Sequence, residues 1–287
     1  MKITLLVDAM NLAHRNYHAL ALRTSDGVPT GMIHGFLSSL LFAQAQTQAT
    51  STVILWDTPT AKLTRRKIFP GYKAHRDVTE RAPDFDEQLF TLDHILSAMG
   101  LQQVSHPKYE ADDLAQYYVE GTGRYVIFSN DADLMQLVTE DGRVQVLHPK
   151  YGLMGWKQVQ QHLGVKPSQV ADFKAITGDS SDEYKGVHGI GPKTAQLVFL
   201  LNPNLDGLFT TPVTLKIHHL PLRAASLILQ NKDEVAMCRE LAKLKGDRVA
   251  SVIVNQCLAD FEQVEKKLKE LELNTLLGRI HELKAMS

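Results

Sequence analysis

Short apolar runs, each followed by an acidic residue, alternate with helical patterns through the first half of the chain. Residues 3–7 form a β-branched run that Asp8 follows, and residues 52–56 form a second run that Asp57 follows. Apolar residues at helical spacing fill the interval between these two runs. The alternation continues over residues 86–99, 101–104, 125–128 and 143–147. This order predicts an α/β fold, a doubly wound and mostly parallel sheet.

Ligands of such a sheet bind outside the carboxyl ends of its strands, where we expect Asp8, Asp57, Asp131 and Asp133. Residues 109–113 (YEADD) add three carboxylates within four residues at the start of a predicted helix. Taken alone, this segment is more typical of an acidic first turn that complements the helix dipole. It becomes a candidate site because the other acidic segments are expected at the same edge of the sheet.

The acidic residues together predict a site for divalent cations. The candidate ligands are Asp8, Asp57, Glu110, Asp112, Asp113, Asp131, Asp133, Asp179 and Asp182. So many converging charges require cations or large pKa shifts at pH 7, and oxygen donors favour two Mg²⁺ ions, with Mn²⁺ as a substitute. Two such ions can activate a water and stabilise the leaving oxygen of a phosphodiester. Each Asp could instead be a helix cap or turn residue, and for Asp131 both roles can hold.

A basic stretch lies at residues 62–76, which contain Lys, Arg and aromatic residues but no acid. The whole chain has 31 Lys and Arg against 32 Asp and Glu, so a polyanion would have to bind a local patch of this kind. Lys73 or Arg76 could also stabilise charge on a scissile phosphate. The alternative is a solvated helix face. The polar residues 77–84 that follow are expected to form a loop or arch.

A glycine-containing hairpin is predicted near residues 178–201, where Gly189 and Gly191 precede Lys193 and Thr194. Backbone N–H groups exposed at the start of the following helix can hold a phosphate of a DNA duplex.

Two domains are expected, because strand patterns weaken and helical spacing takes over after about residue 166. We place an α/β metal-dependent nuclease core at residues 1–165, with a basic arch near 62–90, and a helical DNA-binding region at residues 166–287. Cys238 and Cys257 lie outside any metal-ligand spacing and are expected to be reduced thiols. The first residues lack the pattern of a signal peptide, and no apolar stretch is long enough to span a bilayer. We therefore expect a protein of the cytoplasm, or of the host cytoplasm if it is phage-encoded, that does not enter a membrane.

From residue 3 to about residue 201 the chain resembles the 5′-nuclease family, which includes flap endonucleases, phage 5′-3′ exonucleases and the 5′-nuclease domain of bacterial DNA polymerase I. The matching motifs are VDAMNLAHRNYHA, PTGMIHG, GYKAHR, YEADD, SNDADLMQLV and GDSSDEYKGVHGIGPKTA. The resemblance implies a PIN-like core and a helix-three-turn-helix that holds duplex DNA, with a K⁺ ion at its hairpin. It implies metal binding by the nine acids, catalytic roles for Arg65, Tyr72, Lys73 and Arg76, and DNA contacts by Arg66, Gly189, Gly191, Lys193 and Thr194.

Two groups of ligands are expected on this basis. The first comprises Asp8, Asp57, Glu110, Asp112 and Asp131, and the second comprises Asp113, Asp133, Asp179 and Asp182, with Asp113 as the bridge between them. The chain departs from the usual family pattern at Ala9, Ala132 and Glu183, where Gly, Lys and Asn are common. We expect altered metal affinity from Ala9 and Glu183 rather than lost activity, whereas Ala132 bears on the structure of the arch and the threading of flaps.

The expected function is that of a free-standing, structure-specific 5′ nuclease. It would hydrolyse DNA phosphodiesters by two-metal catalysis, as 5′-3′ exonuclease and 5′-flap endonuclease in replication and repair. We expect a monomer that acts on DNA with 5′ ends or 5′ flaps, with a polymerase or other replication partner in trans. One alternative is a PIN-like ribonuclease, which the hairpin disfavours. The other is a catalytically weak DNA-binding accessory protein, which would be expected to lack one of the acids.

Overall fold

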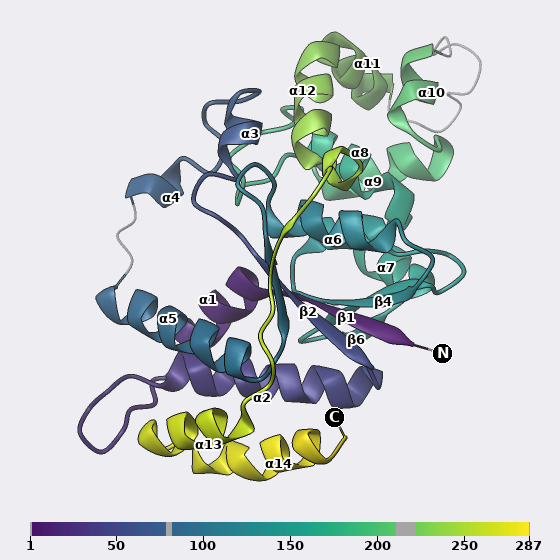
Figure 1. The fold of residues 1–287 in the computed structure, drawn as a ribbon. Helices are drawn as coiled ribbons and strands as arrows, with labels where there is room; N and C mark the ends of the chain where they lie inside the picture. Colours follow the sequence, from purple (N-terminus) through teal and green to yellow (C-terminus); the bar gives the residue numbers. More distant parts are fainter. Residues whose placement is uncertain (1, 79–81, 211–221, 287) are drawn as a thin grey trace.

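A β-sheet forms the centre of the protein in the computed structural model (Figure 1), and seven strands are hydrogen-bonded in it. The structure describes residues 2–78, 82–210 and 222–286. The strand order is β6-β5-β4-β1-β2-β3-β7, in which β1 to β5 pair in parallel while β6 and β7 close the two edges antiparallel. The strands are β1 (Ile3–Asp8), β2 (Ser51–Trp56), β3 (Gln102–Ser105), β4 (Arg124–Phe128), β5 (Val144–His148), β6 (Gly152–Met154) and β7 (Ile253–Asn255). The predicted fold class is confirmed.

The central strands are apolar on both faces because each face supports its own core. Successive side chains of a strand point to opposite sides. In β1, the fully buried Leu5 and Val7 pack into one core, and Leu6, also fully buried, packs into the other. Burial on both sides explains why this strand is a continuous apolar run rather than an alternating one.

Helices cover both faces of the sheet. One face carries α1 (Ala9–Ala19), α2 (Gly31–Thr47), α5 (Pro83–Ala98), α13 (Phe261–Glu270) and α14 (Leu277–Met286). The other face carries α6 (Ala111–Val119) and the 3-10 helix η1 (Ala132–Leu137). None of the described helices combines the length and the apolar character needed to cross a membrane.

The second half of the chain adds a helical region that shares the core of α6. Its elements are α7 (Trp156–Leu163), η2 (Pro167–Gln169), α8 (Val170–Thr177), α9 (Pro192–Leu201), α10 (Leu205–Thr210), α11 (Leu222–Gln230), α12 (Lys232–Ala242) and η4 (Gly246–Arg248). Two short helices, α3 (Leu63–Arg66) and α4 (His75–Val78), lie in the predicted arch segment. Positions 79–81 of that arch lie outside the described residues.

The C-terminal residues differ from expectation. They were grouped with the helical region, but β7 pairs with β3, and α13 packs against α5 on the first region (Figure 1). The backbone N–H of Asp260 donates to the carbonyl of Ala98 at 2.7 Å, which fixes this return. The helix predicted over 258–286 is two helices, separated by η5 (Asn274–Leu276). Strand β7 was not predicted, because it has only three residues, all exposed, and therefore lacks a strand pattern.

Two glycines close the acidic turn at residues 179–184. Gly178 and Gly186 have φ values of +77° and +62°, in the region that side chains disfavour. A Cβ on Gly186 would lie 2.3 Å from the backbone nitrogen of Gly178. The backbone N–H of Asp179 donates to the carbonyl of Tyr184 at 2.8 Å across the turn. The turn that presents Asp179 and Asp182 thus requires these two backbones to touch.

Replacing Gly186→Ala should therefore lower the free energy of unfolding by roughly 2 kcal/mol or more, because both φ and space exclude a methyl group. Urea unfolding followed by circular dichroism measures the change. The matched control is Gly191→Ala, where an added Cβ meets nothing within 4 Å, and it should leave the urea midpoint nearly unchanged. Equal midpoints for the two variants would contradict the requirement for contact.

Candidate active site

Acids from neighbouring strands meet at the carboxyl edge of the sheet through Ser129. Asp8 ends β1, and Ser129 directly follows β4, the strand beside it. The Ser129 hydroxyl donates to Asp8 Oδ2 at 2.8 Å and accepts from the backbone N–H of Asp131 at 3.0 Å. Asp131 in turn caps η1 by accepting from the N–H of Asp133 at 2.8 Å. The parallel topology thus places three acids from two strands next to one another, as the sequence predicted.

Asp8 carries a charge for which the structure provides little compensation. Burial raises its pKa to about 7, and the nearby carboxylates of Asp57 and Asp131 act in the same direction. The hydroxyl of Ser129 and the backbone N–H of Asn11 only partly oppose this rise. A cation at this edge of the sheet would relieve the repulsion among the three carboxylates.

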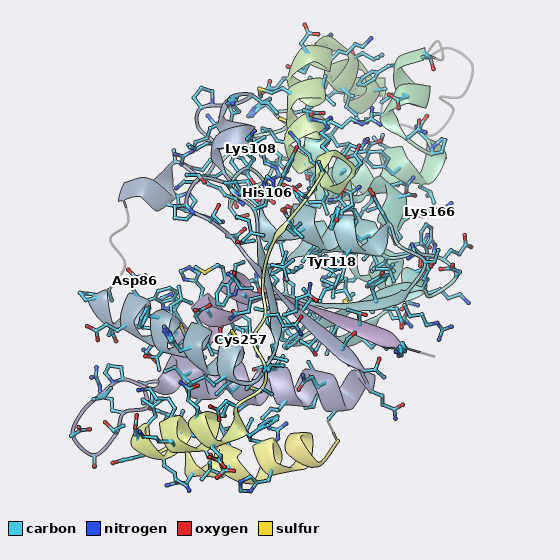
Figure 2. The ribbon with its side chains drawn as sticks, viewed as in Figure 1. Asp86, His106, Lys108, Tyr118, Lys166 and Cys257 are labelled. Atoms are coloured by element: carbon cyan, nitrogen blue, oxygen red, sulfur yellow. The ribbon has the colours of Figure 1, made fainter. Side chains whose placement is uncertain are left out.

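The loop before Glu110 is held in place by threonines. Three hydroxyls donate to successive carbonyls of this loop: Thr58 to His106 at 3.0 Å, Thr60 to Pro107 at 2.7 Å and Thr64 to Lys108 at 2.6 Å. Figure 2 shows His106 and Lys108 on this stretch. Asp57, at the end of β2, accepts from the N–H of Ala111 at 2.8 Å, so the start of α6 is fixed beside the ends of the strands.

Arg65 lies beneath the acidic start of α6 and is 2% exposed. Its guanidinium binds both oxygens of Asp113 at 2.8 Å and Glu110 Oε2 at 2.8 Å, while its Nε–H donates to the carbonyl of Leu241 at 3.1 Å. Asp112 lies 3.7 Å from the same group. A bidentate pair between a guanidinium and a carboxylate is among the stronger side-chain interactions.

Asp113 therefore does not have the role that the sequence suggested. It is 1% exposed, and beyond the Arg65 pair it accepts from the backbone N–H groups of Lys245 at 2.8 Å and Glu110 at 3.2 Å. With both oxygens occupied by these donors, Asp113 is an ion-pair partner rather than a bridge between two metal groups. Arg65 is correspondingly a buried positioning residue and not a group that reaches a substrate.

Tyr72 and Lys73 converge on Glu110. The Tyr72 hydroxyl donates to Glu110 Oε2 at 2.9 Å, and Lys73 Nζ donates to Glu110 Oε1 at 2.7 Å. Burial acts to raise the pKa of Glu110, but Lys73 and Arg65 outweigh it and lower that pKa to about 2. Lys73 also lies 3.6 Å from Asp182. Tyr72 is 1% exposed, so it orients Glu110 rather than contacting a ligand.

Lys174 joins the second set of acids and was missed from the sequence. Its ammonium pairs with Asp133 and, at 2.7 Å, with Asp179. It lies on α8, five positions before Asp179, and nothing in its local sequence distinguishes it from a solvated lysine. Burial acts to raise the pKa of Asp179, but the pairing with Lys174 outweighs it and lowers that pKa to about 2.

The donor set matches a hard cation. In the described ranges, no three His, Cys, Asp or Glu side chains are arranged so that they could hold a metal ion as they stand. Lys73 and Lys174 occupy positions between the carboxylates. The oxygen chemistry of the cluster and the raised pKa of Asp8 both fit a divalent ion such as Mg²⁺.

The predicted nucleic-acid contacts fall into two places. Gly189, Gly191 and Lys193 are exposed where the hairpin enters α9, and Thr194 is partly buried beside them. Arg66 instead turns inward and donates to the carbonyls of Tyr72 at 2.8 Å and Lys73 at 2.9 Å, so it stabilises the turn that contains these two residues. The side chain of Arg76 is 49% exposed and lies 3.9 Å from Asp182, so it can face both solvent and the acids.

Comparisons with known proteins agree over nearly the whole chain. A model of the 5′-3′ exonuclease N-terminal resolvase-like domain matches residues 3–164, and one of the 5′-3′ exonuclease C-terminal SAM fold matches residues 165–274. The chain is 30% identical over 293 residues to the 5′-3′ exonuclease of Aquifex aeolicus (strain VF5), a match covering 99% of this chain and 96% of that protein. It is 33% identical over 279 residues to thermostable DNA polymerase I of Thermus aquaticus, covering 95% of this chain and 32% of the polymerase.

The chain thus spans about a third of the length of the DNA polymerase I relatives that it matches. Among solved structures, the bacteriophage T5 D15 flap endonuclease in a pseudo-enzyme-product complex with DNA and metal ions has a TM-score of 0.68 at 20% identity. That match covers 98% of this chain and 100% of the T5 protein. At this level of identity the likeness shows the fold.

Replacing Arg65→Met should lower the free energy of unfolding by about 3 to 5 kcal/mol, because it leaves Asp113 and Glu110 buried without their cation. Urea unfolding provides the measurement. Arg124→Met, at an exposed position of β4, serves as the matched control and should change the free energy by less than about 0.5 kcal/mol. If both variants change the free energy of unfolding by a similarly small amount, Arg65 is not needed to compensate the charges of Asp113 and Glu110.

The stability of metal-free protein should fall as pH rises through neutrality. The pKa of Asp8 is 3.8 in the unfolded chain and is raised to about 7 in the folded state. Folding therefore takes up a proton at pH values between these two pKa values. Its contribution is therefore complete at low pH and lost above about pH 7. We expect a lower Tm in EDTA at about pH 8 than at about pH 6, and a larger gain in Tm from Mg²⁺ at the higher pH. Asp8→Asn should flatten the pH dependence; an unchanged slope in that variant would contradict the assignment.

Proposed function

This chain belongs to the 5′-3′ exonuclease family, and from that membership we propose that it is a divalent-metal-dependent 5′ nuclease that hydrolyses DNA phosphodiesters. The predicted family resemblance is confirmed by the same comparisons. The observation that carries the proposal is the convergence of carboxylates from β1, β2, β4, α6 and the 179–184 turn beside a basic segment. We propose both 5′-3′ exonuclease and 5′-flap endonuclease activity.

Two sets of carboxylates are proposed to hold the ions. Asp8, Asp57, Glu110, Asp112 and Asp131 would hold one, and Asp133, Asp179 and Asp182 the other. Asp113 is left out because it is 1% exposed and two backbone N–H groups, in addition to Arg65, donate to its oxygens. When bound, such ions supply an activated water and stabilise the leaving oxygen. We propose Mg²⁺ as the working ion, with Mn²⁺ as a substitute, and a K⁺ ion at the hairpin.

The protein's own cations are proposed to orient the DNA. Lys193 is exposed at the start of α9, and its ammonium and the backbone N–H groups of Lys193 and Thr194 would contact phosphates of one strand, without regard to base sequence. Arg76, half exposed beside Asp182, would contact the scissile phosphate and stabilise the charge that develops on it. Lys73, held by Glu110, would keep positive charge next to that position.

Asp8→Asn or Asp131→Asn should reduce cleavage of a labelled 5′-flap DNA by about 100-fold or more while changing binding by far less, because both remove a proposed ion ligand. Single-turnover assays with and without EDTA measure cleavage, and fluorescence anisotropy measures binding. Lys266→Ala, which removes an exposed charge on α13, is the control and should cleave at the wild-type rate. Wild-type cleavage by both Asp variants would reject the proposal.

The same cleavage assay tests a second candidate function, that of a ribonuclease. A ribonuclease on this fold would cleave an RNA flap faster than a DNA flap of the same sequence. We expect the opposite preference, because the exposed residues Gly189, Gly191 and Lys193 of the hairpin would contact the phosphates of a duplex.

A further inference from the structure

Two segments distant in sequence meet beside the acids: residues 71–78, at the base of the predicted arch, and the turn at 179–184. The backbone N–H of Lys73 donates to the carbonyl of Asp182 at 3.3 Å, and the Lys73 ammonium lies 3.6 Å from the Asp182 carboxylate. Arg76 lies 3.9 Å from the same carboxylate. These contacts bring the cations of one segment to an acid of the other.

Glu183 adds an anchor that the catalytic scheme does not use. Its Oε2 accepts from the backbone N–H of His75 at 2.8 Å and lies 2.9 Å from His75 Nδ1. His75 begins α4, so this carboxylate binds the first residue of the short helix that carries Arg76. The two side chains are 34% and 48% exposed, which leaves the pair at the surface of the site rather than in the core.

The backbone conformation at position 183 is one that glutamate rarely adopts. Its φ is +66°, in the left-handed region where glycine or asparagine is better tolerated than glutamate. The shorter side chain of asparagine would not carry its oxygen as far toward His75. The contact with His75 is therefore the physical gain that offsets the less favourable backbone.

Arg76 is the group whose position depends most on this anchor. Lys73 is already fixed by Glu110 at 2.7 Å and by its own backbone N–H. Within the described ranges, the ion pair of Arg76 is the one with Asp182 at 3.9 Å, and its side chain is half exposed, so its direction follows from the backbone of α4. Glu183 holds the start of that backbone.

We propose that Glu183 is a positioning residue of the nuclease: it fixes residues 74–78 to the 179–184 turn and thereby keeps Arg76 beside the acids. The inference rests on the proposed nuclease function. Glu183 is not proposed to bind metal or DNA, because its carboxylate is engaged by His75.

The test uses the full chain with Glu183→Ala and Glu183→Gln in steady-state cleavage of a 5′-flap DNA, which gives kcat and KM. Alanine should lower kcat by about tenfold with KM nearly unchanged, since a misplaced group slows the chemical step more than binding. Glutamine keeps the length and a carbonyl acceptor for the His75 N–H, so it should restore most of the rate. Glu140→Ala, an exposed glutamate in another loop, is the matched control and should cleave at the wild-type rate.

A double-mutant cycle identifies the group through which Glu183 acts. In an Arg76→Ala background, Glu183→Ala should have little further effect, because the residue that it positions is gone. If the two substitutions instead lower kcat independently, so that their effects multiply in the double variant, the role assigned to Arg76 is wrong. His75→Ala provides a second variant of the anchor and should lose less than Glu183→Ala, since the backbone N–H remains.

Limited trypsin digestion without DNA gives a readout that is independent of activity. Release of the 74–78 backbone in Glu183→Ala should speed cleavage after Arg76 relative to wild type and to Glu140→Ala. Unchanged digestion together with an unchanged kcat would overturn the proposal while leaving the nuclease function intact. Failure of the nuclease function itself would show differently, as a wild-type protein that does not cleave the flap at all.

Discussion

The site depends on how its buried negative charge is compensated, and Arg65 supplies much of that compensation. Its guanidinium is almost fully enclosed, yet it makes charged hydrogen bonds to Asp113 and Glu110 and a further bond to the carbonyl of Leu241. An ionised carboxylate left alone at this depth would cost several kcal/mol. Helix α6 can therefore begin with three carboxylates only because an arginine from another segment lies beneath it. The acidic segment is both a helix start and part of a site, since its residues divide these roles among themselves.

Two lysines extend the same principle to the remaining acids. Lys73 pairs with Glu110 and approaches Asp182, while Lys174 pairs with Asp133 and Asp179. The lysines lower the pKa of Glu110 and of Asp179, whereas burial still raises the pKa of Asp133 to about 7 despite its pairing with Lys174. Among the described residues, Asp8 accepts hydrogen bonds from a serine hydroxyl and a backbone N–H but has no cationic partner, and burial raises its pKa to about 7. A bound cation would contribute most beside acids whose pKa stays raised, among them Asp8 and Asp133.

Features encoded in neighbouring residues could be predicted from the sequence, and features that depend on distant partners could not. The strands and the acids at their ends follow local patterns, and the parallel topology then implies that the ends of β1, β2 and β4 lie together. The role of Asp113 depends on Arg65, 48 positions away, and that of Lys174 on Asp133 across the fold. Arg65 and Tyr72 were selected as functional residues, but their burial beneath Glu110 depends on how α3 and α6 pack. Strand β7 is too short and exposed for any periodic signal.

The two regions of the chain are coupled through the turn that contains Asp179 and Asp182. The close approach of Gly178 and Gly186 shapes this turn, and the exposed hairpin at Gly189 follows directly after it. On its other side the turn binds Lys73 and His75 of the arch base. A DNA duplex held at the hairpin would therefore have a fixed separation from the acids and from Arg76, because one short, glycine-constrained segment connects all three. Selection of a DNA structure rather than a base sequence is the expected consequence, since backbone contacts at a fixed distance report shape and carry no direct information on sequence.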